Sequence, residues 1–255
     1  MSDLAALLDK VVDVVREGGD LVMAVYSTDF TVRGKDDASP VTEADERAEA
    51  LMVPRLEALL PGVPVVAEEA VAGGRIPAVR DRFWLVDPLD GTKEFINRNG
   101  EFTVNIALVE QGEPVLGVVL APALGRLFAG ARGVGAFVED DAGRRPIRTR
   151  PVPEAGLTVV ASRSHGDADA LAGFLAGRKV AETRSAGSSL KICLVAAGEA
   201  DVYPRLGRTM EWDIAAGHGV LAAAGGRIDC VAGGPLRYGK PGFDNPHFAA
   251  WGVAD

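Results

Sequence analysis

The sequence predicts an α/β (α+β) protein in which helices and sheets stack in layers. Apolar residues recur at helical spacing over residues 3–17, which indicates an amphipathic first helix. Alternating apolar residues between 102 and 139 indicate a meander of strands, and strand and helix patterns alternate after residue 157. This order of elements is typical of layered α and β structure and not of a pure β-sandwich.

Composition and charge exclude several classes of protein. Of the 255 residues, 47% are hydrophobic and 25% are charged, close to the globular average, which excludes a disordered or fibrous chain. The formal net charge of −9 disfavours nucleic acid or an anionic membrane surface as the main partner. Two cysteines cannot form a disulfide framework, and Cys193, inside an apolar run, is expected to be buried and inert.

Nothing in the sequence indicates a secretory signal or a membrane span. The first twenty residues carry acids and lack a basic segment before an apolar core. The longest apolar stretches, such as 115–123, reach about half of a membrane span and contain Gly or Pro. We expect no integral membrane segment and a cytoplasmic location; peripheral membrane association and a homodimer are left open.

The expected elements of the first half follow the helix over 3–17. A turn or short hairpin is expected over 28–37, and Thr42 with Asp45 resembles a capping box that opens a helix through Leu60. Pro54 should kink that helix or mark its last turn. Strands are expected over 63–67, 82–86, 102–109, 113–121, 126–131 and 135–139.

The charged, Pro-rich stretch 140–153 is the best candidate boundary between two halves. We expect an N-terminal α+β half over 1–145 and a C-terminal α/β half over 146–255. The second half is expected to contain strands over 157–161 and 200–204, and helices over 168–176, 188–197 and 214–224. Ser188 or Ser189 would cap the middle one of these helices.

The segment from Asp87 to Thr92 is the most informative part of the sequence. Pro88 should turn the strand at Asp87, and Gly91 permits a backbone conformation that a Cβ would hinder, so Asp87 and Asp90 should share one tight turn. Two carboxylates about 4 Å apart repel by roughly 4 kcal/mol at an effective dielectric constant near 20. Mg²⁺ would relieve that repulsion, and a plain turn with solvated acids is the structural alternative.

Other acids stand at the expected ends of elements. Glu68 follows the strand over 63–67, Asp45 lies in the expected capping box, and Asp213 directly precedes the Ala-rich helix. Taken alone, an acid in front of a helix is usually only its N-cap. The set of acids, rather than any one of them, therefore suggests a metal site.

Four segments resemble, in order and spacing, the signatures of the inositol monophosphatase superfamily, whose members are Mg²⁺-dependent, lithium-sensitive phosphomonoesterases. The resemblance extends across nearly the whole chain and implies an αβαβα layered sandwich. The four segments are Val41–Asp45, Ala67–Glu69, Trp84–Thr92 and Trp212–Gly217.

Finer features resemble one branch, the bacterial 3′(2′),5′-bisphosphate nucleotidases (the CysQ group). This branch removes the 3′-phosphate of adenosine 3′,5′-bisphosphate, a by-product of sulfate activation, and leaves AMP. Inositol monophosphatases usually have Thr-Asn-Phe where this chain has Lys93-Glu94-Phe95. Arg208–Glu211 departs from the expected Gly-Pro-Thr pattern, which leaves the shape of the loop before Asp213 open. The segments that match are 90–108, 162–165, 187–191 and 201–205.

The resemblance implies two or three Mg²⁺ ions. Glu68, Asp87 and the carbonyl of Leu89 would hold the first, while Asp87, Asp90 and Asp213 would hold the second; Glu68, through waters, would help to hold a third. Two such ions clamp a phosphate and support both oxygens of an in-line displacement.

The resemblance also implies roles around the phosphate. Thr92, backed by Asp45 and Glu69, would orient and deprotonate the attacking water, and the amides of Gly91 and Thr92 would face phosphate oxygens. Each candidate substrate contact also has a plain structural alternative, such as a solvated lysine, a helix cap or a surface ion pair. These candidates are Lys93, His165, Ser188, Ser189, Lys191 and Arg205.

Two alternatives to the nucleotidase remain open. One is an inositol phosphatase or fructose bisphosphatase of the same superfamily. The other belongs to a different class, a non-catalytic module that binds divalent ions or a protein partner. The presence of Thr92 argues against such a module, because binding alone does not need a residue that orients water.

Overall fold

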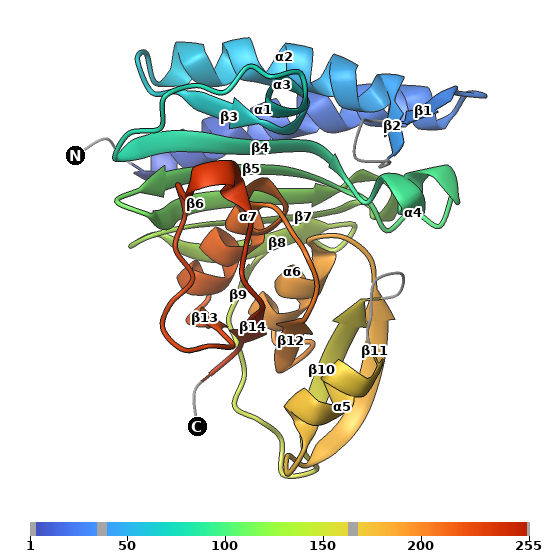
Figure 1. The fold of residues 1–255 in the computed structure, drawn as a ribbon, viewed down its shortest axis with the longest axis vertical. Coiled ribbons are helices and arrows are strands. Elements are labelled where there is room, and N and C mark those ends of the chain that lie inside the picture. Colours follow the sequence, from blue (N-terminus) through green and yellow to red (C-terminus); the bar gives the residue numbers. More distant parts are fainter. Residues whose placement is uncertain (1–3, 35–39, 163–167, 254–255) are drawn as a thin grey trace.

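The structure is a computed structural model that describes residues 4–34, 40–162 and 168–253. Helices and sheets alternate through it in layers (Figure 1). Two long helices cover one face of a seven-stranded sheet, two further helices lie between that sheet and a five-stranded sheet, and a short helix covers the far side of the second sheet. This arrangement confirms the predicted layered α/β fold.

The outer layer consists of α1 (Leu4–Tyr26) and α2 (Glu43–Leu59). The prediction that the first helix ends near residue 17 was wrong, because the helix continues through Gly18 and Gly19. A Cβ on Gly18 would lie 2.7 Å from Sδ of Met52, and one on Gly19 would lie 2.4 Å from Cδ2 of Leu120. These glycines therefore allow close packing on α2 and on the sheet and do not end the helix.

The start of α2 follows the predicted capping box. The backbone amide and the hydroxyl of Thr42 both donate to Oδ2 of Asp45, over 2.8 and 2.7 Å, and Thr42 accepts from the amide of Ala44. Pro54 lies inside the helix. The expected hairpin before it is a two-stranded ribbon of β1 (Val32–Gly34) and β2 (Pro40–Thr42); the expected turn residues 35–37 lie outside the described residues.

The seven-stranded sheet has the order β3-β4-β5-β6-β7-β8-β9. The predicted meander is confirmed, since each strand from β4 to β9 pairs antiparallel with the next, while β3 and β4 are parallel. The last strand falls inside the charged stretch and was not predicted. The strands are β3 (Val65–Ala67), β4 (Arg82–Asp90), β5 (Thr103–Glu110), β6 (Glu113–Ala121), β7 (Arg126–Ala131), β8 (Gly135–Asp140) and β9 (Gly143–Ile147), with a 3₁₀ turn, η1 (Pro122–Leu124), after β6.

Strand β4 differs from the prediction at the end that carries the acids. The chain does not leave the sheet at Asp87 but continues in strand conformation to Asp90. The register against β5 shifts between these two residues, so Pro88 lies in an irregularity of the ladder. Proline has no backbone N–H to donate, and such an irregularity is where a strand tolerates it. Gly91 then has a φ of 89° and leads into the short helix α4 (Thr92–Ile96).

The five-stranded sheet has the order β11-β10-β12-β14-β13. Strand β10 is parallel to both of its neighbours, and β14 runs antiparallel to β12 and β13. The outer helix α5 (Ala168–Leu175) packs Leu171, Phe174 and Leu175 on this sheet. The strands are β10 (Leu157–Ser162), β11 (Val180–Ala186), β12 (Val202–Arg205), β13 (Arg227–Cys230) and β14 (Phe248–Trp251); β11, β13 and β14 were not predicted.

The layer between the sheets consists of α6 (Leu190–Ala196) and α7 (Glu211–Ala223). Both helices belong to the second half of the chain, yet α7 packs on β5, β6 and β7 of the first half. Cys193 on α6 is buried as predicted, and burial raises the pKa of its thiol. Among the described residues, no helix is long and apolar enough to span a membrane.

Glycines set the distance between α7 and the large sheet. A Cβ on Gly117 of β6 would lie 2.0 Å from the carbonyl oxygen of Ala216, and one on Gly219 would lie 2.9 Å from the amide of Gly117. Backbone thus meets backbone at this crossing. Any side chain at Gly117 would push the helix away from the sheet.

We therefore expect Gly117→Ala to lower the free energy of unfolding by at least about 2 kcal/mol, because overpacking against backbone atoms cannot relax by rotating a side chain. Urea unfolding measures the change. Gly173→Ala is the matched control, since the exposed Gly173 lies within α5 and nothing lies within 4 Å of the added Cβ. Equal stability of the two variants would contradict the close crossing.

His218 on α7 is buried, and its Nδ1 lies 2.9 Å from the hydroxyl of Tyr238. Burial, reinforced by the charge of Arg237, lowers the pKa of His218 to about 3. The unfolded chain takes up this proton near pH 6.5, whereas the folded chain does not, so stability falls as the pH falls from about 6.5 towards 3.

We expect His218→Gln to remove that pH dependence. Between pH 7 and pH 5, the wild type should lose about 2 kcal/mol more unfolding free energy than the variant does, at 1.36 kcal/mol per pH unit. Urea titrations at both pH values measure the difference. The exposed His247 provides the control substitution His247→Gln; parallel pH profiles for wild type and His218→Gln would contradict a neutral buried imidazole.

Candidate active site

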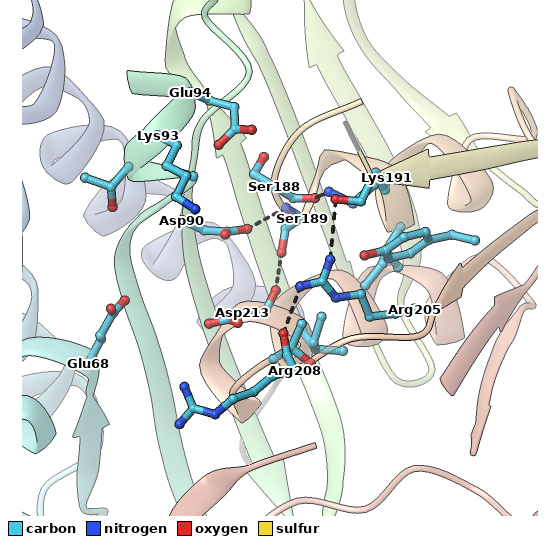
Figure 2. Close-up of a pocket in the computed structure, with 17 residues that line it drawn as sticks. Glu68, Asp90, Lys93, Glu94, Ser188, Ser189, Lys191, Arg205, Arg208 and Asp213 are labelled. Carbon is cyan, nitrogen blue, oxygen red and sulfur yellow. Dashed lines mark hydrogen bonds between the residues drawn. The ribbon is translucent and has the colours of Figure 1, made fainter. Parts of the chain in front are cut away.

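A pocket of about 400 Å³ opens where the end of β4, the start of α6 and the start of α7 meet (Figure 2). It gathers segments that lie far apart in the sequence, and most of the predicted site residues lie on its wall. The predicted residues on the wall are Glu68, Asp90, Gly91, Thr92, Lys93, Ser188, Ser189, Lys191, Arg205 and Asp213. His165 lies outside the described residues.

The first carboxylates come from two neighbouring strands. Glu68 follows β3 and is the first residue of α3 (Glu68–Ala72), a helix that was not predicted. Asp87 is buried in β4, where its Oδ1 accepts the amide of Leu89 over 3.0 Å. Because β3 and β4 are parallel neighbours, their ends bring these two acids to the same edge of the sheet.

Asp90 lies at the end of β4 and is held from the other half of the chain. The backbone amide of Ser189 donates to its Oδ2 over 2.6 Å, and the hydroxyl of Thr103 lies 3.5 Å from the same oxygen. Burial raises the pKa of Asp90 to about 6, although the charge of Lys191 and the amide of Ser189 act in the opposite direction. No pattern in the sequence indicated this contact, because Asp90 and Ser189 lie 99 positions apart in the chain and belong to different layers.

Asp213 completes the set of acids. It was expected just before its helix, but α7 begins at Glu211, so Asp213 lies in the first turn. Its Oδ2 accepts the amide of Met210 over 2.9 Å, which explains why the helix starts early. Burial and the charges of Asp90 and Glu68 raise the pKa of Asp213 well above its ordinary value.

The two serines before α6 do not act as predicted. Neither caps the helix with its side chain; Ser189 at the cap position is helical and makes no such bond. Its hydroxyl instead donates to the carbonyl of Asp213 and accepts from Nδ2 of Asn105, 3.2 Å away. Ser189 therefore links the end of β4, strand β5 and the start of α7.

Ser188 has a different environment. Its φ of 43° is unusual for a residue with a side chain, and its buried hydroxyl has no hydrogen-bond partner within the described part of the chain. A strained residue with an unused hydroxyl on a pocket wall is a feature of binding sites. The hydroxyl of Ser188 is thus buried without a hydrogen-bond partner in the described part of the chain, whereas the amide and hydroxyl of Ser189 are engaged.

The opposite wall is cationic. Lys191 is buried, donates to the carbonyl of Ser188 over 2.6 Å and lies 5.3 Å from the ring centre of Tyr203. Burial lowers the pKa of Lys191 to about 8. Arg205, at the end of β12, donates to the carbonyl of Arg208 over 2.8 Å and contacts the hydroxyl of Ser162 over 3.4 Å.

Of the residues expected to activate water, Thr92 lies on the pocket wall, whereas Asp45 and Glu69 are not among the residues that line it. The hydroxyl of Thr92 lies 3.4 Å from the carbonyl of Leu89, and the carboxylate of Asp45 accepts from Thr42. Glu49, which sequence reasoning missed, is buried and accepts the amide of Glu69 over 2.7 Å. Burial raises the pKa of both Asp45 and Glu49 to about 7.

The donor set fits a hard divalent cation. Burial raises the pKa of Asp87, and the charges of Glu68, Asp90 and Asp213 raise it further. These acids lack sufficient positive charge to balance them, and carboxylate and carbonyl oxygens are the ligands that Mg²⁺ prefers. In the positions that the structure describes, however, no group of three or more His, Cys, Asp or Glu side chains could hold a metal ion, so the fit is one of ligand chemistry and not of assembled geometry.

Comparisons with known proteins agree with this geometry. The profile of the inositol monophosphatase family matches residues 3–252, which confirms the resemblance found in the sequence. A protein of Escherichia coli K12 named 3′(2′),5′-bisphosphate nucleotidase CysQ is 47% identical over 245 residues, which cover 95% of this chain and 98% of the relative. A namesake from Haemophilus influenzae is 33% identical over 254 residues, which cover 96% and 93% of the two chains.

Solved structures show the same fold. The crystal structure of CysQ from Bacteroides thetaiotaomicron, described as a bacterial member of the inositol monophosphatase family, has a TM-score of 0.82 at 35% identity and covers 98% of both chains. An inositol monophosphatase (IMPase) from Thermotoga maritima has a TM-score of 0.78 at 29% identity, covering 96% of this chain and 92% of the other.

Proposed function

We propose a specific reaction for this chain, which belongs to the inositol monophosphatase family of phosphatases: it removes the 3′-phosphate of adenosine 3′,5′-bisphosphate with Mg²⁺ and leaves AMP and phosphate. The observation that carries the proposal is the division of the pocket into an acidic wall and a cationic wall. The names of the relatives above support the same reaction.

The acidic wall would hold the metal ions. Glu68, Asp87 and the carbonyl of Leu89 would hold one ion, and Asp87, Asp90 and Asp213 another, with a third position near Glu68. When bound, such ions polarise a phosphate and lower the pKa of a bound water. Asp87 is buried behind the wall and adjoins both sets of ligands, so it is the candidate for a shared ligand.

Thr92 would orient the attacking water. It is the first residue of α4, directly after Asp90 and Gly91, and it lies on the pocket wall, which supports this role. Asp45 and Glu69 would complete the route that takes the proton from that water. Lys93, on the same wall, would balance the charge of the reacting phosphate.

The cationic wall would bind the second phosphate and the nucleoside. Lys191 and Arg205 contact only neutral partners in the hydrogen bonds given above, so their charges are not cancelled by a direct ion pair there. A ligand that places a separate anionic group against each wall must carry two such groups, as a bisphosphate does. Ser188 offers a hydroxyl beside them, and contacts from Ser189 and His165 stay predictions.

The cationic wall favours a bisphosphate over inositol 1-phosphate, which carries a single phosphate. Phosphate release from the two compounds, measured side by side with Mg²⁺, tests the proposal. Faster hydrolysis of the nucleotide supports it. Preference for inositol 1-phosphate would assign the chain to the other activity of the family, and release from neither would favour the non-catalytic module.

We expect Asp90→Asn to retain the fold and to lower kcat at least about a hundredfold. The amide keeps the size and removes one ligand charge, and a loss of about 2.7 kcal/mol of transition-state stabilisation corresponds to that factor. Steady-state kinetics at saturating Mg²⁺, with circular dichroism as the check on folding, measure the effect. Wild-type turnover would remove Asp90 from the metal site.

We expect Arg205→Ala to lower kcat/KM for adenosine 3′,5′-bisphosphate about ten- to a hundredfold, because one charge-assisted contact contributes roughly 1.5–3 kcal/mol. A small phosphomonoester, which has no second phosphate, should be affected much less. Arg47→Ala removes an exposed arginine of α2 and controls for the change in net charge. An equal fall for both substrates would place Arg205 at the reacting phosphate or in the fold.

A further inference from the structure

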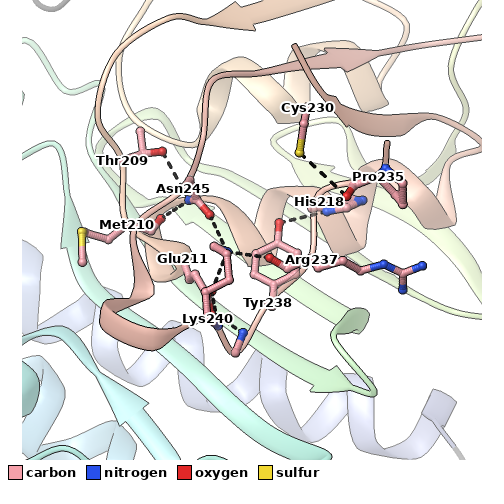
Figure 3. A network of polar contacts seen from close by, with 11 residues as sticks. Thr209, Met210, Glu211, His218, Cys230, Pro235, Arg237, Tyr238, Lys240 and Asn245 are labelled. Carbon is pink, nitrogen blue, oxygen red and sulfur yellow. Dashed lines mark hydrogen bonds and ion pairs between the residues drawn. The ribbon is translucent and has the colours of Figure 1, made fainter. Parts of the chain in front are cut away.

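Residues 237–245, here called the strap, connect β13 to β14 and pass the start of α7 (Figure 3). The strap has no part in the reaction as described above. It nevertheless carries a network of polar contacts, and that network reaches Met210 and Glu211 at the start of α7, the turn that contains Asp213.

An ion pair with a buried carboxylate fastens the strap to α7. Glu211, two residues before Asp213, is fully buried, and its carboxylate accepts the amides of Gly239 and Lys240 over 2.7 and 2.9 Å. The ammonium of Lys240, whose side chain is half-buried, lies 2.6 Å from the same carboxylate. A buried carboxylate is unfavourable unless it is well bonded, so these three donors hold the strap in one arrangement against α7.

The backbone of the strap is also constrained. Phe243 has a φ of 59°, a left-handed conformation that is strained for a residue with a side chain. Its ring is buried, with its centre 5.8 Å from that of Trp212, the residue before Asp213. The strap is thus held in a strained shape against the turn of α7.

Asn245 links the strap to the turn that holds Asp213. Its Oδ1 accepts from Lys240 over 3.2 Å, and its Nδ2 donates to the carbonyl of Met210 over 2.7 Å and to the hydroxyl of Thr209 over 3.3 Å. Lysine only donates and a carbonyl only accepts, which fixes the orientation of the amide.

The peptide between Thr209 and Met210 is held at both of its polar atoms. Its carbonyl accepts the backbone amide of Asn245 over 2.9 Å, and its N–H donates to Oδ2 of Asp213 over 2.9 Å. The side chain of Asn245 holds the next peptide along the chain through the carbonyl of Met210. Any rotation of these two peptides would turn the N–H away from Asp213.

We propose that Asn245 is a positioning residue for the metal site: through Met210 it fixes the carboxylate of Asp213 in the orientation that binds a divalent ion. This inference rests on the proposed role of Asp213. The strap, braced by Glu211 and Lys240, keeps Asn245 in place. Removing a residue that orients a metal ligand through hydrogen bonds typically lowers metal affinity by about ten- to a hundredfold.

The test uses Mn²⁺ alone as the probe, with no substrate present, and counts free Mn²⁺ by electron paramagnetic resonance. We expect Asn245→Ala to weaken Mn²⁺ binding about tenfold while the protein stays folded by circular dichroism. If Ala prevents folding, Asn245→Asp serves instead, since it is nearly isosteric, keeps the acceptor for Lys240 and loses the donors to Met210 and Thr209.

Tyr238→Phe is the matched control. It lies on the same strap and loses only the hydroxyl that contacts His218, so it perturbs the strap without touching the turn before Asp213. Its Mn²⁺ affinity should stay within twofold of the wild type. An equal loss in Tyr238→Phe, or unchanged affinity in a folded Asn245 variant, would overturn the positioning role.

Asp213→Asn separates this proposal from the proposed function. It should weaken Mn²⁺ binding at least as much as Asn245→Ala does. Unchanged affinity in Asp213→Asn would overturn the metal assignment and the positioning role together. A protein that binds Mn²⁺ as predicted but does not hydrolyse the nucleotide would overturn only the choice of substrate and leave the role of Asn245 standing.

Discussion

The mutual repulsion of buried carboxylates at the end of β4 is the constraint on which the site depends. Asp87, Asp90 and Asp213 all have raised pKa values, chiefly because burial removes them from water; the charge of Glu68 raises all three further, and the charge of Asp90 raises those of Asp87 and Asp213. A fold does not gather such groups for stability, since apolar residues of similar size would cost less. A bound divalent cation, as proposed above, would account for the arrangement.

The acids come together because two layers of the fold pack closely against each other. Asp87 and Asp90 come from the large sheet, whereas Asp213 comes from a helix of the second half, and α7 reaches the sheet closely only because glycines line the crossing. Ser189 then fixes the relative positions, with its amide on Asp90 and its hydroxyl on the carbonyl of Asp213. Packing between layers is therefore what sets the geometry of the acids.

Local signals in the sequence predicted the parts of the site that local geometry determines. The capping box of Thr42 and Asp45 and the strands of the meander depend on neighbours in the chain, and the structure confirms them. The predicted first helix ended at residue 17, whereas α1 continues through Gly18 and Gly19, whose role is contact with other layers. Asn105, Glu49 and Asn245 were missed for a related reason: each acts on a residue at least twenty positions away, and no spacing rule reveals that.

The cations of the pocket wall keep their charge because their hydrogen-bond partners are neutral groups. Elsewhere arginines sit beside acids, as Arg150 does with the buried Asp201, and such pairs cancel each other. Lys191 instead contacts a carbonyl and an aromatic ring, and Arg205 contacts a carbonyl and a hydroxyl. Neutral partners orient a cation without neutralising it, so the positive potential remains directed into the pocket. A ligand with an anionic group at each end could satisfy both walls, one through a metal ion and the other through these cations, and this is the physical argument for the bisphosphate proposed as substrate.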